Sequence, residues 1–232
     1  MKETIKKMPV IGNVVTRLYW KLRAPVSKPA PFPGTHDYWE QPYRSGGNSG
    51  VGSYGKFADF KAEVVNGFVA KNSVQSVIEF GCGDGNQLKL ADYPSYIGVD
   101  ISEYVISACR DQFAGDTSKA FVVMDDYRGE KADLALSMDV IYHLVEDNVF
   151  ERYMRTLFGA AERFVVIYSS NSDDNKGYEQ SHIRHRNFTD WVNSNIPYWS
   201  LSKSIPNAHP YRGDYRVGSF ADFFIYEMRG SR

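Results

Sequence analysis

Residues 77–86 combine an apolar run, an acid and three glycines in the stretch VIEFGCGDGN. Gly81, Gly83 and Gly85 stand two residues apart at the end of this run. A glycine-rich turn after a strand lets the backbone approach a flat, polar ligand, because no Cβ stands in the way. Dinucleotide-binding turns have the spacing G-x-G-x-x-G, whereas the sixth position here is Asn86. The spacing therefore predicts a nucleotide-type site and argues against a nicotinamide-dependent oxidoreductase.

Further apolar runs along the chain also end in acids. They are 96–102 with Asp100, 120–124 before Asp125 and Asp126, and 132–139 with Asp139. In nucleotide-binding α/β folds, an acid at the end of the second strand accepts hydrogen bonds from both ribose hydroxyls. The order of the runs thus predicts a sheet whose carboxyl edge carries a ribose-binding acid, Asp100.

The pattern E-x-G-x-G-x-G, together with these acids, resembles the class I methyltransferases that use S-adenosyl-L-methionine (SAM) and release S-adenosyl-L-homocysteine. This resemblance implies a Rossmann-like α/β fold with a seven-stranded, mostly parallel sheet, helices on both faces and a last strand that runs antiparallel. It places Asp125 and Asp126 near the adenine amine. The cofactor-binding residues that it implies are Glu79, Gly81, Cys82, Gly83, Asp100, Ile101, Asp125, Asp126 and Met138.

The segment 38–55 precedes the first predicted strand and joins aromatic residues to a glycine-serine stretch. In class I methyltransferases this part often closes over SAM as a lid. Tyr54 is therefore expected at the cofactor, and Arg44 at the cofactor carboxylate or the substrate. The stretch G-G-x-S-G-x-G-S-Y-G is similar to methyltransferases encoded with bacterial surface-glycan genes, which implies a saccharide acceptor. A plain surface loop is the alternative.

Two groups of residues are candidates for acid–base work and for acceptor binding. Asp139 and His143 follow the fourth predicted strand, and an imidazole with a pKa of about 6.5 suits a general base. The sequence HIRHR supplies a second group after the fifth strand, His182, Arg184, His185 and Arg186. Here His185 is a candidate base, and the arginines with His182 are candidates for binding an anionic acceptor. The alternatives are a packed histidine and a basic surface loop; no metal site is predicted, because ligand spacing is absent.

Composition is that of a globular enzyme. The chain has 232 residues, of which 43% are hydrophobic and 24% are charged, and its net charge is −1. A nucleic-acid-binding surface is normally basic, so no nucleic-acid partner is expected. Cys82 and Cys109 form neither a disulfide framework nor a metal spacing, which predicts a reducing, cytoplasmic location.

Residues 1–34 differ from the rest and are predicted to be separate from a methyltransferase domain at 35–232. The first 30 residues carry seven lysines and arginines and one glutamate, and Val14, Leu18 and Leu22 share one helical face. Such a basic amphipathic helix can lie on the inner face of a membrane, or it can pack against its own domain or another subunit. A proline-rich linker, 24–34, follows.

The remaining elements must position these side chains. Helical periodicity predicts helices at 57–70, 103–113 with Ser102 as N-cap, 148–163 and from Asn187 onward. Apolar β-type runs predict further strands at 164–170, Trp199–Ile205 and 220–228.

Three functions fit the sequence. The first is a methyltransferase, in particular an O-methyltransferase, acting on a hydroxyl or phosphate of a saccharide or glycan. The second is a methyltransferase for another small molecule, since cofactor motifs carry no information on the acceptor. The third, a non-catalytic SAM-binding protein, is disfavoured because a candidate base and a candidate anion site are both present.

Overall fold

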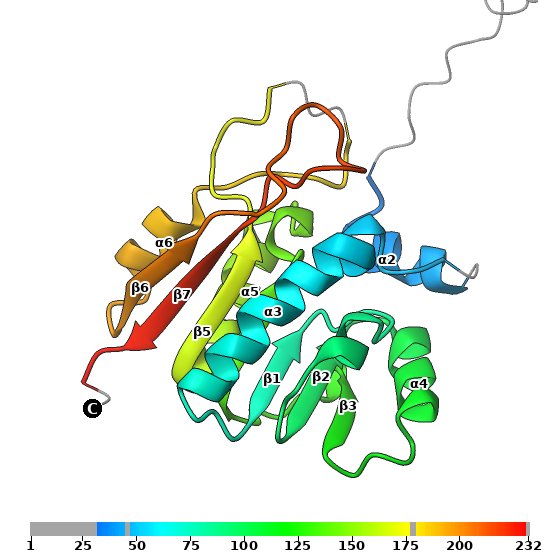
Figure 1. Cartoon of the computed structure of the whole chain (residues 1–232). Helices are drawn as coiled ribbons and strands as arrows, with labels where there is room; N and C mark the ends of the chain where they lie inside the picture. Colours follow the sequence, from blue (N-terminus) through cyan, green and yellow to red (C-terminus); the bar gives the residue numbers. More distant parts are fainter. Residues whose placement is uncertain (1–31, 45–46, 177–179, 231–232) are drawn as a thin grey trace, which may run out of the picture. The chain divides into compact units, whose positions relative to one another are not determined.

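Seven strands form one sheet in the order β3-β2-β1-β4-β5-β7-β6 (Figure 1). The computed structural model describes residues 32–44, 47–176 and 180–230. The strands are β1 Val77–Phe80, β2 Tyr96–Asp100, β3 Lys119–Val123, β4 Ala132–Met138, β5 Ala161–Ser169, β6 Trp199–Ile205 and β7 Asp222–Met228. Strand β7 runs antiparallel to both of its neighbours, β5 and β6. The predicted fold, a mostly parallel seven-stranded sheet with an antiparallel last strand, is confirmed.

Helices cover both faces of the sheet, which is why its central strands are largely buried and mostly apolar. The helices are α2 Thr35–Arg44, α3 Gly55–Lys71, α4 Glu103–Gln112, α5 Asp147–Ala160 and α6 Phe188–Asn195. In Figure 1, α3 crosses in front of the sheet and α5 lies behind it. The core accordingly has two parts, one with buried side chains of α3 and α4, and one with those of α5 and α6.

The helix after β2 begins as predicted, since the Ser102 side chain accepts a hydrogen bond from the backbone N–H of Val105 at 3.3 Å. The Asn187 side chain caps α6 in the same way. The helix predicted over 148–163 ends earlier, at Ala160. Residues 161–163 belong instead to β5, where Ala161 pairs with Ala132 of β4. Pairing with the sheet here outweighs the helix propensity of Glu162 and Arg163.

The segment before β1 is more ordered than the predicted glycine-serine loop. It contains α2 and a short 3₁₀ turn at Val51–Ser53 that leads into α3. Residues from Phe32 onward form one compact unit. The predicted amphipathic helix and most of the linker of residues 1–34 lie outside the described residues. Within the described ranges, no helix is both long and apolar enough to cross a bilayer.

Candidate active site

The glycine turn after β1 requires glycine at two positions for both conformation and space. Gly81 and Gly83 have φ values of 82° and 57°, in the left-handed region that disfavours side chains. A Cβ on Gly81 would collide with Val140 Cγ2, and one on Gly83 would collide with Ser49 Oγ. The turn is therefore held tightly between the loop after β4 and the segment before β1.

Two buried acids stand beside this turn at the carboxyl ends of β1 and β2. Asp100 accepts the Gly83 N–H on Oδ2 and the Ser102 N–H on Oδ1, each at 3.0 Å, and burial raises the pKa of this carboxyl. Glu79 accepts the Tyr96 hydroxyl at 2.6 Å. Burial raises the pKa of Glu79 to about 7, although the Tyr96 hydrogen bond and the charge of Lys61 act in the opposite direction. Each Asp100 oxygen can still accept a further hydrogen bond.

Hydrogen bonds to Asp84 hold the segment before β1 against the glycine turn. Asp84 Oδ2 accepts the Tyr54 hydroxyl at 2.7 Å and the Ser49 N–H at 2.9 Å. In return, the Asp84 N–H donates to Ser49 Oγ at 2.8 Å. The Tyr43 hydroxyl lies 3.2 Å from the same Ser49 oxygen. Tyr54 thus contacts the glycine turn, and residues 49–54 form a cover over it.

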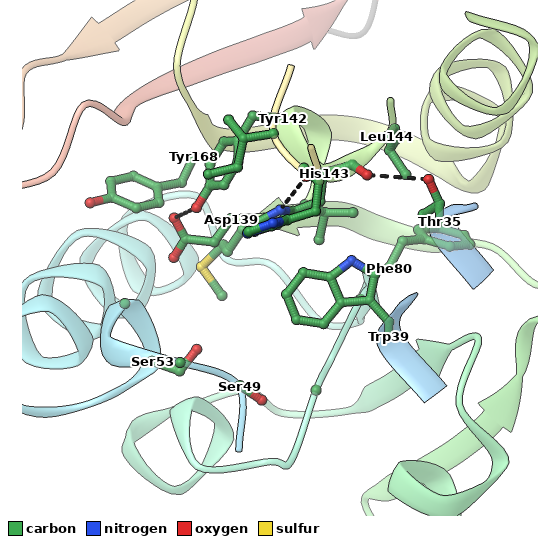
Figure 2. Close-up of a pocket in the computed structure, with 18 of the residues that line it drawn as sticks. Thr35, Trp39, Ser49, Ser53, Phe80, Asp139, Tyr142, His143, Leu144 and Tyr168 are labelled. Atoms are coloured by element: carbon green, nitrogen blue, oxygen red, sulfur yellow. Dashed lines mark hydrogen bonds between the residues drawn. The ribbon is translucent and has the colours of Figure 1, made fainter. Parts of the chain in front are cut away.

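Asp139 and His143 lie on the other side of the same cavity, which measures about 1380 Å³. Figure 2 shows Asp139, His143 and Trp39 around one open space, with Ser49 and Ser53 across from them. Asp139 Oδ2 is 2.7 Å from Lys61 Nζ. Its Oδ1 accepts the hydroxyl of Tyr142 at 2.8 Å, a hydrogen bond drawn in Figure 2. The carboxylate therefore has two donors from two elements, α3 and the 3₁₀ turn Ile141–His143.

His143 is enclosed by aromatic rings and has a defined tautomer. Its Nδ1 is 3.1 Å from the carbonyl oxygen of His182. A carbonyl only accepts, so Nδ1 carries the proton and Nε2 the lone pair. The ring packs edge-on against Trp39, with 4.6 Å between centroids. Burial lowers the pKa of His143 to about 4. The imidazole is therefore neutral at neutral pH.

Helix α2 is fixed above this histidine by two sets of contacts. The Tyr38 ring stacks on the His182 ring at 4.5 Å, and His182 in turn stacks on His143 at 5.6 Å. At the start of the helix, Thr35 donates its N–H and its hydroxyl to the two carboxylate oxygens of Glu146, at 3.1 and 2.6 Å. Burial lowers the pKa of His182. Arg44 ends this helix, and its side chain is outside the described part of the structure.

Comparison with known proteins identifies the type of domain. Residues 55–203, more than half of the chain, match the family model for a methyltransferase domain. The chain belongs to this family. In sequence, this methyltransferase is 28% identical over 102 residues to the tRNA (carboxymethyluridine(34)-5-O)-methyltransferase of Arabidopsis thaliana. That match covers 42% of this chain and only 25% of the Arabidopsis protein.

Solved structures agree on the fold. The magnesium protoporphyrin IX methyltransferase of Synechocystis PCC 6803 with bound S-adenosylhomocysteine has a TM-score of 0.59 and 14% identity, covering 83% of this chain and 97% of that one. The methyltransferase domain of bacterial CtHen1 has a TM-score of 0.57 and 21% identity, covering 73% of this chain and 97% of that one. The methyl donor is SAM, as predicted from the sequence.

The residues of this methyltransferase fit that donor. Gly81 and Gly83 present backbone without a side chain to the cavity, and the buried Asp100 carboxylate keeps room for further hydrogen bonds. Of the other predicted contacts, Cys82, Ile101, Asp125 and Met138 also line the cavity. Asp126 is exposed and lies 3.6 Å from Arg128. Among the described residues, no group of three or more His, Cys, Asp or Glu is placed to hold a metal ion.

The two arginines predicted to bind an anionic acceptor contact the loop before α5. Arg186 is buried; it donates to the carbonyls of Leu144 and Val145, at 2.5 and 2.8 Å, and to Asp147 Oδ1 at 3.0 Å. Arg184 shares Asp147 Oδ1 at 2.9 Å. Their acceptor-binding role stays a prediction, and these contacts favour a role in holding the loop that carries His143. His185 is also buried, with Nδ1 2.6 Å from Ser170 Oγ.

Replacing Arg186 by methionine should lower the free energy of unfolding by about 2 kcal/mol or more, because the buried Leu144 carbonyl loses its charged donor and the contacts with Val145 and Asp147 are lost as well. Urea denaturation measures this. The matched control is Arg184→Met, where a side chain that is 43% exposed makes the change about 1 kcal/mol or less. Unchanged stability combined with a raised acceptor KM in Arg186→Met would support the anion-binding role instead.

Sequence reasoning missed several residues that line the cavity. Lys61 lies on a helix with an apolar stripe, where a lysine is normally exposed to solvent. It is buried here because it pairs with Asp139, and the sequence gives no signal for that contact. Trp39 was recognised only as part of an aromatic segment. The loop between β6 and β7 contributes Tyr211, Tyr215 and Phe220, which no motif marked. The aromatic content of 206–221 is the one available signal.

Proposed function

We propose that this methyltransferase transfers the methyl group of SAM to a hydroxyl of a small, ring-containing acceptor, a saccharide or glycan precursor. The observation that carries the proposal is the placement of His143. It is a neutral imidazole with a fixed tautomer, and it lines the same cavity as the glycine turn and Asp100. A hydroxyl acceptor must lose a proton during the reaction, and His143 is the side chain best suited to take it.

For the donor, we assign roles to the residues around the glycine turn. Asp100 would accept the ribose hydroxyls, and Asp125 would lie at the adenine. The backbone of Gly81 and Gly83, under the cover formed by Ser49 and Tyr54, would face the methionine part. SAM supplies a methyl group that its sulfonium already activates. The protein therefore has to bind, orient the acceptor, exclude water and accept a proton.

The proton acceptor in this proposal is His143 Nε2. Its Nδ1–H is held by the His182 carbonyl, which orients the ring and leaves the other nitrogen for the acceptor hydroxyl. The pKa of about 4 makes this histidine a weak base. A weak base is sufficient, because a hydroxyl oxygen that is gaining a methyl group becomes a strong acid. Asp139 would orient the turn, since its Oδ1 accepts the Tyr142 hydroxyl while its Oδ2 is paired with Lys61.

The acceptor class is inferred from the walls of the cavity. Trp39, Tyr142, Tyr211 and Phe220 line it, and aromatic faces stack on sugar rings as they do on other flat or apolar faces. The volume of about 1380 Å³ exceeds the 300–1,000 Å³ usual for one small ligand, so a donor and an acceptor fit together. A tRNA acceptor, the substrate named for the Arabidopsis relative, is less favoured here. Lysines and arginines number 27 against 28 acidic residues, which gives no excess for phosphate binding.

The test is a methylation assay of the full chain with methyl-labelled SAM and four acceptor sets. These are neutral oligosaccharides, sugar phosphates, hydroxylated non-sugar aromatics and unmodified tRNA. Label in a base-stable methyl ether of a saccharide would support the proposal. Label in tRNA or only in the non-sugar aromatics would contradict the acceptor class. Label on nitrogen or carbon would contradict the O-methyl assignment.

A further inference from the structure

The cavity contains a buried cation that the function proposed above does not use. Lys61 lies in the middle of α3, and its side chain is 1% exposed. Lysine is almost never fully buried unless it is paired. Its Nζ is 2.7 Å from Asp139 Oδ2 and 5.5 Å from the centre of the Tyr168 ring. The second carboxylate near it is Glu79, whose pKa it lowers. The ammonium is thus enclosed by one direct partner, one aromatic face and one neighbouring acid.

The partner of Lys61 has an unusual backbone conformation. Asp139 has a φ of 61°, and it is one of two non-glycine residues with positive φ in the described ranges. Few residues other than glycine adopt the left-handed region; aspartate is one that does, and its contacts then hold it there. Those contacts are the Asp139 N–H to the Tyr168 carbonyl at 2.9 Å and the hydrogen bonds from Lys61 and Tyr142. Gly52 lies directly against Asp139 Oδ2, where a Cβ would be 2.9 Å away.

This conformation determines where the next residues go. The chain leaves β4 at Met138, turns at Asp139 and continues into the 3₁₀ turn Ile141–His143. Tyr142 in that turn donates back to Asp139, and His143 follows it against Trp39. A change in the conformation of Asp139 would therefore move His143 relative to the cavity.

We propose that Lys61 is a positioning residue: its ammonium holds Asp139 in the left-handed conformation that directs His143 into the cavity. Lys61 acts through Asp139 and does not itself exchange a proton with the acceptor. The inference rests on the role proposed for His143, but its structural part, the link from Lys61 to the conformation of Asp139, is independent of that role.

Four variants test it: Lys61→Met, Asp139→Asn, the double variant, and Lys71→Met as an exposed lysine on the same helix. Kinetics use the best acceptor found in the methylation assay. We expect Lys61→Met to lower kcat by about 10²-fold, the cost of misplacing a reacting group by about 1 Å, with the Kd of SAM changed less than about threefold. Asp139→Asn should have a similar effect. The double variant should be no worse than either single change, because both act on one contact. Lys71→Met should match the wild type.

Crystal structures of the same variants separate this inference from the proposed function. In Lys61→Met, Asp139 should leave the left-handed region and the Trp39–His143 ring contact should change. If these changes occur but kcat does not fall, Lys61 positions the turn and His143 is not the base. If Asp139 and His143 stay in place, the positioning role is refuted, whatever the activity. If Lys61→Met does not fold, the double variant, which removes both charges of the pair, is compared with Asp139→Asn. A kcat of the double variant at least tenfold below that of Asp139→Asn would show that Lys61 acts independently of Asp139, which would overturn the proposal.

Discussion

Replacing Asp100 by alanine is expected to weaken SAM binding by about 2 kcal/mol or more, roughly 30-fold, because two charge-assisted hydrogen bonds to the ribose are lost. The carboxylate is buried at the end of β2 and lies directly beside the glycine turn. Isothermal titration calorimetry on the folded variant measures the effect. Because Asp100 also holds the N–H groups of Gly83 and Ser102, part of the loss will come from a looser turn.

The control for Asp100 is Asp133→Ala. Asp133 also accepts a backbone N–H, that of Gln75 at 2.7 Å, but it lies near the amino end of β4, away from the carboxyl edge. Its variant should bind SAM like the wild type. A folded Asp100→Ala protein with wild-type affinity would remove Asp100 from the donor site.

Replacing His143 by asparagine is expected to lower kcat by about 10²-fold or more, with the affinity for SAM little changed. Asparagine can keep the hydrogen bond to the His182 carbonyl, while no basic nitrogen remains in the place of Nε2. Steady-state kinetics with a defined acceptor give the measurement. A second readout is the pH profile. Because burial lowers the pKa of His143 to about 4, the wild-type kcat should stay level from neutral pH down to about pH 5 and fall below that as the base is protonated.

The matched control is His185→Asn. His185 is a buried histidine from the same part of the sequence, but its Nδ1 is occupied by Ser170 and its ring packs edge-on against Phe220. Equal losses of kcat in both variants would indicate a general disturbance of the loops. A wild-type kcat in His143→Asn would exclude it as the base and reopen the sequence-based candidate, His185.

Local sequence patterns were sufficient for the sheet and for the donor. A strand that contains Glu79 near its end and runs into three spaced glycines predicts its own turn, because the constraint lies in adjacent residues. The N-cap Ser102 is likewise local. For this reason the order of elements, the SAM-type turn and most helix starts could be predicted from the sequence. The end of α5 could not, since Ala161–Arg163 extend β5 through pairing with β4, a contact between distant parts of the chain.

The acceptor side depends on distant partners and was harder to predict. The basic sequence HIRHR has the composition of an anion site, but the carbonyls and the carboxylate that Arg186 contacts are about 40 residues away, at Leu144, Val145 and Asp147. The burial of Lys61 depends on a carboxylate 78 residues away. The sequence predicted a lid of aromatic residues and a glycine-serine stretch at 38–55, but not helix α2, whose contacts with His182 and Glu146 are tertiary.

The extent of the family match has a consequence for how such enzymes diverge. The match begins at Gly55, the first residue of α3, and ends at residue 203, inside β6. Helix α2 and the loop 206–221, which close the cavity around His143, both lie outside it. Two members of the family can therefore share the matched region almost entirely and still methylate unrelated compounds. In this chain, we expect that exchanging Trp39, Tyr211 or Phe220, which line the cavity, would change the acceptor and leave the donor half of the sheet unchanged.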